Sequence, residues 1–407
     1  MQTPPVREND LVVVEPVDLV AGGASISKLD GFAVFTRGIY PGDRARVVIR
    51  EVKKNHATAD LEELLLAGPL RRAYPCPVAS ECGGCDWTSL RLDHQLAFKQ
   101  KILLDSLSRI GRFNASQLPP LRIHPSPLNY RIRSRLHRDG AGQIGFFAAR
   151  SHTVIPLPEE CEVVGPEVAA NRQVIAEAAS ADQAGSILTF ENGRELLVDL
   201  IKSESDDDEE QNPVTGQGTP VSIDVGPFHY ELFTTSFFQV NRHLLTRLIG
   251  LVTAIAEGSR QRRSAIDLYS GVGFFTLPLS KLFHSVVAVE RSPASAPFAA
   301  LNAQPYANVE CVEDSVEDYF RRTKRCFDFV MVDPPRAGIR TTVLDSIDRM
   351  NPQTICYLSC DPVTFARDSA HLSRRGWVLQ TLDLIDLFPN THHIETLASF
   401  QRAKASG

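Results

Sequence analysis

The stretch Ser264-Ala-Ile-Asp-Leu-Tyr-Ser-Gly-Val-Gly273 decides the fold, because an apolar run enters a turn with two closely spaced glycines. The run predicts a buried strand, and residues 274–282 continue as a helix. Glycines in such a turn let the backbone approach a ligand closely. Doubly wound folds bind their ligands at the carboxyl ends of the strands. The stretch therefore predicts the first strand and the cofactor turn of an α/β domain.

Strand and helix patterns alternate around this stretch, from about residue 234 to the C-terminus. Residues 241–257 have a helical pattern, and further strands are expected at 284–289, 308–312, 327–332, 354–359 and 377–385. Such alternation is typical of a doubly wound, mainly parallel sheet. We therefore expect a C-terminal α/β domain over residues 233–407.

An acidic residue ends the strand that follows the glycine turn. Glu290 lies 17 residues after Gly273, where a carboxylate can accept hydrogen bonds from both hydroxyls of a ribose. The chain lacks the full glycine pattern of dinucleotide sites and the Gly-Lys-Ser/Thr of triphosphate sites. A nucleoside without pyrophosphate, such as S-adenosyl-L-methionine, fits better. The alternative is a tight turn followed by a surface glutamate.

Two further strand ends carry reactive groups. Cys360 follows an apolar run, and the loop Asp333-Pro-Pro-Arg336 follows another. The prolines stiffen this loop and so hold its carboxylate and guanidinium in place. A thiol is an effective nucleophile when a neighbouring group raises its thiolate fraction, and Phe388-Pro-Asn-Thr-His-His-Ile-Glu395 supplies acid and base groups. These features predict covalent chemistry beside a cofactor; a buried thiol and a rigid turn are the alternatives.

Four cysteines form a separate group. Three follow the pattern Cys76-X5-Cys82-Gly-Gly-Cys85, and Cys161 is the fourth. Because disulfides are rare in cytosolic proteins, we interpret the four thiols as a soft metal site. Tetrahedral zinc and a four-cysteine iron–sulfur cluster are both chemically possible.

Composition sets broader limits. The chain has 407 residues, which favours two or three domains, and we expect it to be cytoplasmic because no signal core or membrane span is found. Its net charge of −6 comes from six acidic residues within 204–210, since the rest carries 43 acidic and 43 basic residues. Basic clusters remain at 131–138, 260–263 and 321–325. A nucleic-acid partner is therefore allowed but not demanded.

Turn residues divide the N-terminal half into smaller parts. Short strands between tight turns over residues 10–66 predict a small barrel, within a domain expected at 1–70. A β-rich central domain with the cysteines is expected at 71–232. It includes a helix over 88–110, which can pack on the C-terminal domain. The acidic stretch 203–220 predicts a disordered loop.

Five ordered motifs together resemble the RNA 5-methyluridine methyltransferases. They are Ser236-Phe-Phe-Gln-Val-Asn241, Asp267-Leu-Tyr-Ser-Gly-Val-Gly273, Asp333-Pro-Pro-Arg336, Ser359-Cys-Asp-Pro362 and Phe388-Pro-Asn-Thr-His-His-Ile-Glu395. The N-terminal part is similar to their TRAM domain, an OB-like β-barrel that binds RNA. The four cysteines resemble the [4Fe-4S] cluster ligands of the branch that modifies 23S ribosomal RNA. The resemblance implies a Rossmann-like S-adenosylmethionine methyltransferase domain behind a TRAM barrel and an iron–sulfur domain.

The resemblance also implies roles for individual residues. Cys360 falls on the nucleophile and Glu395 on the final base. The positions that contact S-adenosyl-L-methionine are Gln239, Tyr269, Glu290, Asp314 and Asp333, and those that bind the cluster are Cys76, Cys82, Cys85 and Cys161.

The implied activity is formation of 5-methyluridine in 23S ribosomal RNA, through addition of the cysteine thiolate to C6 of a flipped uridine. The alternatives are a transfer-RNA (uracil-5-)-methyltransferase and an RNA-binding or RNA-folding protein with dispensable methyl transfer. Phe237 is a candidate to stack on the flipped base, or a core residue. The chain departs from the family at Ser270, where a cysteine is usual, and at Asp361, where an asparagine is usual. We expect the protein to act as a monomer.

Overall fold

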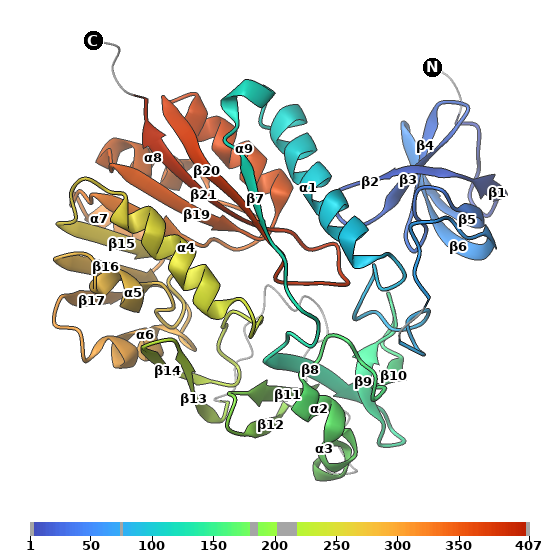
Figure 1. Cartoon of the computed structure of the whole chain (residues 1–407), viewed down its shortest axis with the longest axis horizontal. Coiled ribbons are helices and arrows are strands. Elements are labelled where there is room, and N and C mark those ends of the chain that lie inside the picture. The colour runs from blue at the N-terminus through green and yellow to red at the C-terminus, as the bar shows by residue number, and fades with distance from the viewer. Residues whose placement is uncertain (1–3, 74–75, 180–185, 202–217, 404–407) are drawn as a thin grey trace.

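The computed structural model describes residues 4–73, 76–179, 186–201 and 218–403, which form an N-terminal β unit, a central β unit and a C-terminal α/β unit (Figure 1). The loop expected at 203–220 lies outside the described residues up to Gln217. No described helix combines the length and the apolar character needed to cross a membrane.

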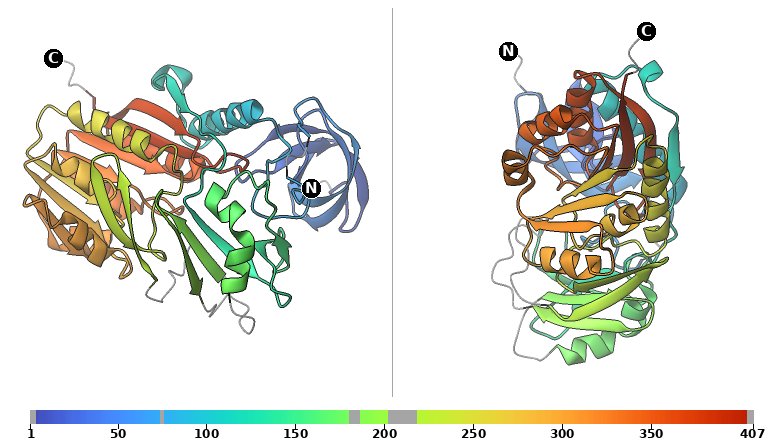
Figure 2. Two further views of the ribbon diagram at one scale, coloured as in Figure 1. Left: turned by 60° about the horizontal axis from the view of Figure 1, so that its bottom comes forward. Right: turned by 90° about the vertical axis from the view of Figure 1, so that its left-hand side faces the viewer.

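The N-terminal unit is a six-stranded sheet in the order β1-β5-β6-β4-β3-β2. Figure 2 shows these strands curling around a small core at one end of the molecule. The strands are β1 (Leu11–Val14), β2 (Pro16–Leu19), β3 (Ser25–Leu29), β4 (Phe32–Thr36), β5 (Arg44–Val52) and β6 (His56–Leu66). Their alternating side chains, such as Val47 and Ile49 of β5, fill the interior. The β-rich pattern expected for residues 10–66 is therefore observed.

The central unit is a five-stranded sheet in the order β10-β9-β8-β11-β12. Its strands are β8 (Arg133–Arg138), β9 (Ile144–Phe147), β10 (Val154–Pro156), β11 (Ser186–Glu191) and β12 (Leu196–Ile201), and two short helices, α2 (Pro166–Ala170) and α3 (Arg172–Ala178), pack beside them. A separate hairpin of β13 (Pro220–Val225) and β14 (Phe228–Phe233) packs on the C-terminal unit and shares its core.

The C-terminal unit is built on an eight-stranded sheet in the order β17-β16-β15-β18-β19-β21-β20-β7. Its strands are β15 (Ser264–Leu268), β16 (Ser285–Glu290), β17 (Val309–Glu313), β18 (Phe329–Val332), β19 (Thr354–Ser359), β20 (Trp377–Ile385) and β21 (Glu395–Arg402), with β7 (Leu121–His124) at one edge. The five strands from β17 to β19 are parallel, and β21 runs antiparallel to both of its neighbours. The expected mainly parallel sheet is therefore confirmed.

Apolar residues cover both faces of this sheet. Along β19, Ile355 and Tyr357 join one core while Cys356 and Leu358 join the other, as the alternation of a strand requires. The helices are α4 (Leu245–Glu257), α5 (Thr276–Ser280), α6 (Ala296–Ala303), α7 (Val316–Arg322), α8 (Thr341–Met350) and α9 (Pro362–Ser373). Helices α7, α8 and α9 contribute to the first core, and α4 and α5 to the second.

Two elements reach the C-terminal unit from the segment between the two β units. The helix expected over 88–110 is present as α1 (Leu92–Arg109), and it packs against α9 of the C-terminal unit. After the short 3-10 helix η1 (Ala115–Gln117), strand β7 pairs in parallel with β20 and closes the sheet edge. Both elements bring the N-terminal half of the chain against the C-terminal unit.

Candidate active site

The parallel strands bring the expected site residues to one edge of the C-terminal sheet. Tyr269, Asp314, Asp333 and Cys360 directly follow β15, β17, β18 and β19, whereas Glu290 is the last residue of β16. Because these five strands run in the same direction, their carboxyl ends lie together. The strand order also reverses here, between β15 and β18, which is where ligands bind in such folds.

Glu395 reaches the same edge by a different route. It is the first residue of β21, which runs opposite to β19 with Ser359 paired to Thr396. Cys360 directly follows Ser359, and Glu395 directly precedes Thr396, so both residues adjoin the last pair of this register. The expected nucleophile and the expected base therefore lie at the adjacent ends of neighbouring strands, 35 residues apart in the sequence.

The Glu395 carboxyl lies in a nearly closed environment, with 5% of the residue exposed. Burial and the nearby Asp333 carboxyl raise its pKa well above the ordinary value, while Arg336 acts in the opposite direction. A raised pKa makes a carboxylate a stronger proton acceptor. This environment suits a general base.

Cys360 lies between the end of β19 and the beginning of α9, and it is partly exposed. The next residue, Asp361, caps α9: its Oδ1 atom accepts from the backbone N–H groups of Val363 at 2.9 Å and Thr364 at 2.7 Å. Asp and Asn are similarly good helix caps, so Asp361 can cap α9 as well as the asparagine that is usual in the family. A helix N-terminus stabilises a nearby thiolate.

The loop 333–336 is held between two neighbouring segments. Gln239 Nε2 donates to Asp333 Oδ2 at 3.1 Å, and Thr364 Oγ1 donates to the Arg336 carbonyl at 3.1 Å. Arg336 Nη2 also lies 3.3 Å from His393 Nδ1. Burial, with Asp267 nearby, raises the pKa of Asp333 to about 8, although the hydrogen bond from Gln239 lowers it. The loop thus places a carboxyl with a high proton affinity beside Gln239.

Asp333→Asn is expected to stabilise the ligand-free protein at pH 8 by on the order of 1–3 kcal/mol. The folded pKa lies above that of an unfolded aspartate, so ionisation disfavours the fold increasingly as pH rises from about 4 to about 8. The gain should therefore be large at pH 8 and absent near pH 4. Denaturant unfolding of both proteins across this range measures it; equal stability at pH 8 contradicts the assignment. Loss of the Asp333 carboxyl also removes its repulsion of the neighbouring Glu395 carboxyl, which contributes to the same gain.

The expected cofactor end of the site is organised around Glu290. One carboxylate oxygen accepts from the Gly271 N–H at 2.8 Å and the other from the Ser292 N–H at 2.6 Å. The Glu290 carbonyl accepts from the Asp314 N–H at 3.0 Å, and the Asp314 side chain pairs with Arg322. Glu290 thereby links the turns after β15, β16 and β17.

Tyr269 leaves β15 with a φ of +61°, in the left-handed region. Non-glycine residues adopt this conformation infrequently, and such residues gather at functional sites. The backbone thus turns away from β15 at Tyr269 itself, which is one of the expected cofactor contacts.

Sequence reasoning assigned no separate role to Asp267. It is fully buried in β15, and its Oδ2 atom accepts from Thr276 Oγ1 at 2.6 Å. Among the described atoms its Oδ1 atom has no hydrogen-bond partner, and burial raises the pKa of the carboxyl to about 7. The sequence feature that could have pointed to Asp267 was an acidic residue in the middle of an apolar strand. Asp267 fixes the helical turn after the glycines through Thr276.

The central unit supports the loop that carries Gln239. Arg133 of β8 donates to the carbonyls of Ser236 at 2.8 Å and Thr235 at 3.4 Å. Phe237, next in the loop, is 62% exposed, whereas Phe238 is buried in the core. At least one arginine of the basic cluster at 131–138 thus has a structural contact, and Phe237 is an apolar ring displayed to solvent.

The expected cysteine site is a single cavity. Cys76, Cys82, Cys85 and Cys161 all line it, together with apolar walls that include Phe146. The Gly84 N–H donates to Cys82 Sγ at 3.4 Å. A Cβ atom at Gly83 would lie 2.7 Å from the Phe147 carbonyl, so the loop needs glycine to pack this closely on β9. The structure brings the four thiols together.

Four thiols around one cavity are a donor set of the chemical type that binds an iron–sulfur cluster. Among the described residues, however, no group of three or more His, Cys, Asp or Glu is arranged so that it could hold a metal ion. Burial raises the pKa of Cys85 to about 12, so a cationic group is needed to hold this thiol deprotonated.

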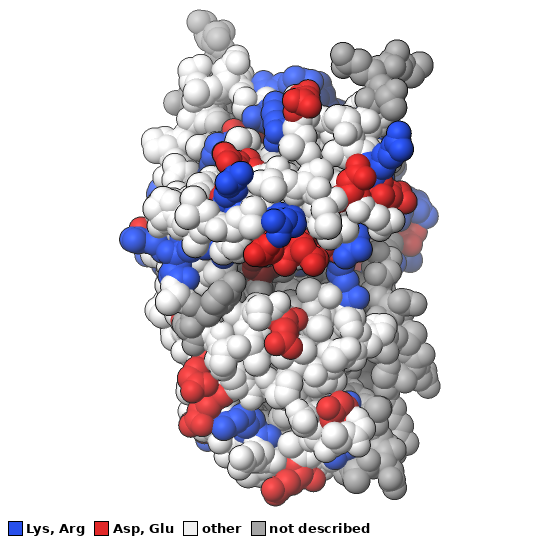
Figure 3. All heavy atoms as spheres, turned by 90° about the vertical axis from the view of Figure 1, so that its right-hand side faces the viewer, with Lys and Arg blue, Asp and Glu red and all other residues white. Residues whose placement is uncertain are grey.

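Charges of both signs are mixed on the side of the molecule where the N-terminal sheet lies (Figure 3). Several basic residues of this sheet pair with acids, such as Arg50 with Asp60 at 2.8 Å and Arg46 with Glu63. The described residues of this face therefore form no broad basic patch of the kind that binds nucleic acid by charge alone.

Comparisons with known proteins agree with this arrangement. A model of the tRNA (uracil-5-)-methyltransferase family matches residues 218–403. A Thiobacillus denitrificans protein named 23S rRNA (uracil(1939)-C(5))-methyltransferase RlmD is 31% identical, with 96% of this chain and 99% of the relative covered. An uncharacterized RNA methyltransferase of Aquifex aeolicus is also 31% identical, with 93% and 96% covered.

A solved structure shares the fold. The Pyrococcus abyssi tRNA (uracil-54, C5)-methyltransferase, in complex with S-adenosyl-L-homocysteine, superposes with a TM-score of 0.72 at 24% identity. The superposition covers 95% of this chain and 100% of that one. The arrangement of all three units is therefore shared along nearly the whole chain.

Proposed function

This chain belongs to the RNA uracil-5-methyltransferase family, whose members are S-adenosylmethionine-dependent enzymes, and we propose that it forms 5-methyluridine in 23S ribosomal RNA. The observation that supports this chemistry is the register of β19 and β21, in which Ser359 pairs with Thr396, so that Cys360 and Glu395 adjoin the same pair at the carboxyl edge of the parallel strands. The choice of 23S RNA is supported by the Thiobacillus relative, whose name specifies that substrate. The four-cysteine cavity supports the same branch. We further propose that the protein acts in the cytoplasm as a monomer.

Cys360 begins the reaction in this proposal. C5 of uracil is a poor nucleophile, so the Cys360 thiolate first adds to C6 and turns the C4–C5 edge into an enolate. C5 would then attack the methyl group that S-adenosyl-L-methionine supplies, so that the C5–methyl bond forms as the methyl–sulfur bond breaks and a neutral thioether leaves. The N-terminus of α9 beside Cys360 favours the thiolate that this addition requires.

Glu395 completes the reaction. After methyl transfer, C5 carries both the new methyl group and its original hydrogen. The Glu395 carboxylate removes that proton, the C5–C6 double bond re-forms, and the C6–S bond breaks to release the Cys360 thiolate. A buried carboxyl with a raised pKa is a suitable acceptor for this proton.

S-adenosyl-L-methionine supplies the methyl group as a positively charged sulfonium when it is bound. Glu290 has both oxygens at the turn where a ribose would lie, and Asp314 stands at the next strand end for the adenine. Tyr269 lines the turn between them. Gln239 and Asp333, joined by their hydrogen bond, face the methionine and the target.

The target uridine must leave its stack so that a thiol can reach C6 and a methyl donor can reach C5. Exposed Phe237, two residues before Gln239, is placed to stack on the flipped base. We propose that the N-terminal sheet binds the surrounding RNA as a TRAM-like domain. Its mixed charges favour recognition of RNA shape over uniform attraction to phosphates.

Phe237→Ala is expected to reduce methylation by about 10- to 100-fold, because base–aromatic stacking contributes about 1–3 kcal/mol. The free energy of unfolding should change by less than about 0.5 kcal/mol, since the ring is exposed. Single-turnover methylation and denaturant unfolding measure the two effects. Leu301→Ala removes another exposed apolar side chain and should alter neither. A strongly destabilised Phe237→Ala with normal turnover would assign Phe237 to the core instead.

The four cysteines are proposed to hold a [4Fe-4S] cluster. Methyl transfer needs no electrons, so the cluster has no redox step to perform in this reaction. Its ligands lie in the loop after the N-terminal sheet and in the central unit, where a cluster would join the two. We therefore propose that the cluster has a structural or RNA-positioning role.

The experiment that tests the proposed substrate uses RNA from a strain that lacks this gene. Purified protein and S-adenosylmethionine are added to total RNA, and 5-methyluridine is mapped by mass spectrometry of separated 23S and transfer RNA. New 5-methyluridine is expected in 23S RNA and not in transfer RNA. Modification of transfer RNA alone would assign the alternative substrate, and no modification with folded protein would favour an RNA-binding role.

A further inference from the structure

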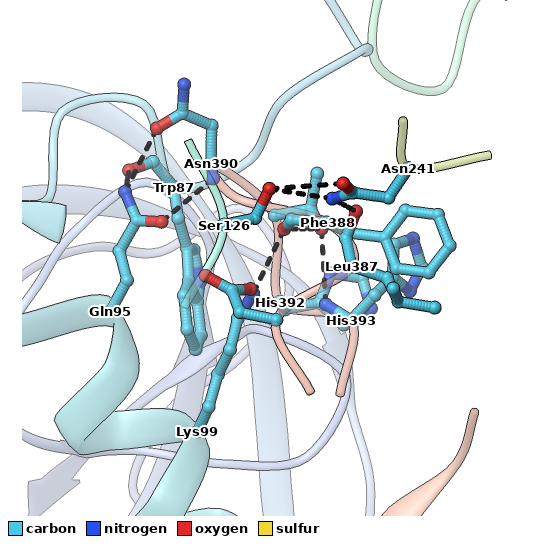
Figure 4. Close-up of polar contacts among 12 residues, drawn as sticks. Trp87, Gln95, Lys99, Ser126, Asn241, Leu387, Phe388, Asn390, His392 and His393 are labelled. Atoms are coloured by element: carbon cyan, nitrogen blue, oxygen red, sulfur yellow. Dashed lines mark hydrogen bonds and ion pairs between the residues drawn. The ribbon is translucent and has the colours of Figure 1, made fainter. Parts of the chain in front are cut away.

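The segment 386–394 connects β20 to β21 and ends directly before Glu395. We call it the base loop, and Figure 4 shows the polar contacts that surround it. Its first residues are fixed from two sides. Lys99 Nζ donates to Asp386 Oδ1 at 2.6 Å and to the Phe388 carbonyl at 3.0 Å, and Asn241 Nδ2 donates to the Leu387 carbonyl at 2.8 Å.

The middle of the base loop depends on Asn390, which is fully buried. Its backbone N–H donates to Gln95 Oε1 at 2.8 Å, and its carbonyl accepts from the Trp87 N–H at 3.0 Å. Its side-chain Oδ1 accepts from Gln95 Nε2 at 3.1 Å and from Arg72 Nη2 at 2.9 Å. Its Nδ2 donates to Glu162 Oε2 at 2.8 Å. Every polar atom of Asn390 is therefore engaged.

These contacts join the base loop to the four-cysteine cavity. Asn390 and Glu162 both line that cavity, and Glu162 directly follows Cys161. A second contact lies beside Cys85: the next residue, Asp86, accepts from the His392 N–H at 3.0 Å and lies 2.6 Å from His392 Nδ1. Two residues adjacent to cysteines thus hold the base loop from the cavity side.

The far end of the base loop reaches the reacting groups. His393 stands between Phe388, with ring centroids 5.5 Å apart, and Arg336 of the loop 333–336. Glu395 follows two residues later and directly precedes Thr396, which pairs with Ser359, the residue before Cys360. A shift of the loop at Asn390 would therefore move the start of β21.

We propose that Asn390 is a positioning residue, which fixes the base loop to the wall of the four-cysteine cavity and so sets the position of Glu395 relative to Cys360. This inference rests on the proposed role of Glu395. It gives the cysteine site a mechanical function in proton removal, through Asn390 on one side and the Asp86–His392 pair on the other.

The backbone conformation of Asn390 allows a sharp test. Its φ of +67° lies in the left-handed region, which glycine adopts freely and alanine does not. Asn390→Gly therefore removes the side-chain contacts while the backbone can keep its own. Asn9 has almost the same φ, +68°, in an exposed turn, so Asn9→Gly is a matched control for the added chain freedom.

Two measurements on the full chain separate positioning from a general loss of structure. Hydrogen–deuterium exchange of the peptide that contains 386–394 is expected to quicken about tenfold or more in Asn390→Gly, while residues 264–290 keep their protection. Exchange of the same peptide should also quicken in Cys161→Ser. With RNA substrate, kcat of Asn390→Gly should fall about tenfold, with KM little changed, and the methylated Cys360–RNA adduct should accumulate because proton removal is slowed.

The outcomes are distinct. Unchanged exchange of the base loop in Asn390→Gly, or lost activity without accumulated adduct, overturns the proposal. A similar effect in Asn9→Gly also overturns it, because that would be a general effect of glycine. If the wild-type protein forms no adduct even with RNA that carries 5-fluorouridine at the target, the proposed function fails. Exchange still decides whether Asn390 holds the loop, because it requires no turnover.

Discussion

Cys360→Ala is expected to lower the formation of 5-methyluridine by at least about 10⁴-fold. Without the thiolate, C5 of uracil has no route to the electron-rich state that captures a methyl group. Binding of S-adenosylmethionine should persist, because the proposed cofactor positions are Gln239 and residues at the ends of β15, β16, β17 and β18, and Cys360 is not among them. Mass spectrometry of RNA nucleosides after single turnover measures the loss, and calorimetry measures the retained cofactor affinity.

The control for this variant is Cys326→Ser, which replaces an exposed thiol outside the site. It should methylate RNA at the wild-type rate. Appreciable 5-methyluridine from Cys360→Ala, with Cys326→Ser behaving normally, would rule out covalent catalysis through Cys360.

Glu395→Gln is expected to slow turnover by about 10²- to 10⁴-fold and to trap the reaction after methyl transfer. The amide has nearly the same shape as the carboxyl but cannot accept the C5 proton, so the C6–S bond is not released. A denaturant-resistant protein–RNA adduct that carries the new methyl group should accumulate with ordinary uridine RNA. Gel electrophoresis with a labelled methyl donor detects it.

The double variant Cys360→Ala with Glu395→Gln should form no such adduct, which ties the trapped bond to residue 360. Glu395→Gln that turns over normally would remove Glu395 from the role of base. Slow turnover without a methylated adduct would place Glu395 before methyl transfer, in substrate binding or thiol activation.

The parallel core of the fold was predictable because its strands are short apolar runs bounded by turns. Each expected strand from 264–269 to 377–385 is present within about two residues. Since parallel strands share one carboxyl edge, the clustering of Glu290, Asp333 and Cys360 followed from the pattern. Tyr269 and Asp314 were named only through resemblance to a family.

The position of Glu395 could not be obtained in this way. Strand β21 returns antiparallel between β19 and β20, and only this pairing brings Glu395 to the strand end that carries Cys360. No strand was expected over residues 395–402, and sequence patterns do not show which neighbours a strand pairs with. The role of Glu395 came instead from resemblance to a family.

Long-range polar contacts were also beyond the sequence. Asn390 lies 295 positions from Gln95 and 228 from Glu162, yet it bonds to both. Asp267 was visible only as one acid in an apolar strand. The role of a buried polar group depends on the hydrogen-bond partners that the fold brings to it, and those partners come from three different parts of this chain.

Capture of the covalent intermediate is the most direct test of the central claim. RNA with 5-fluorouridine at the target cannot release a proton from C5, so the bond from sulfur to C6 should persist after methyl transfer. Peptide mass spectrometry is expected to find the methylated nucleotide attached to Cys360 in the wild-type protein and to find none in Cys360→Ala. A methylated product without any attachment, or attachment to a different residue, would contradict the mechanism.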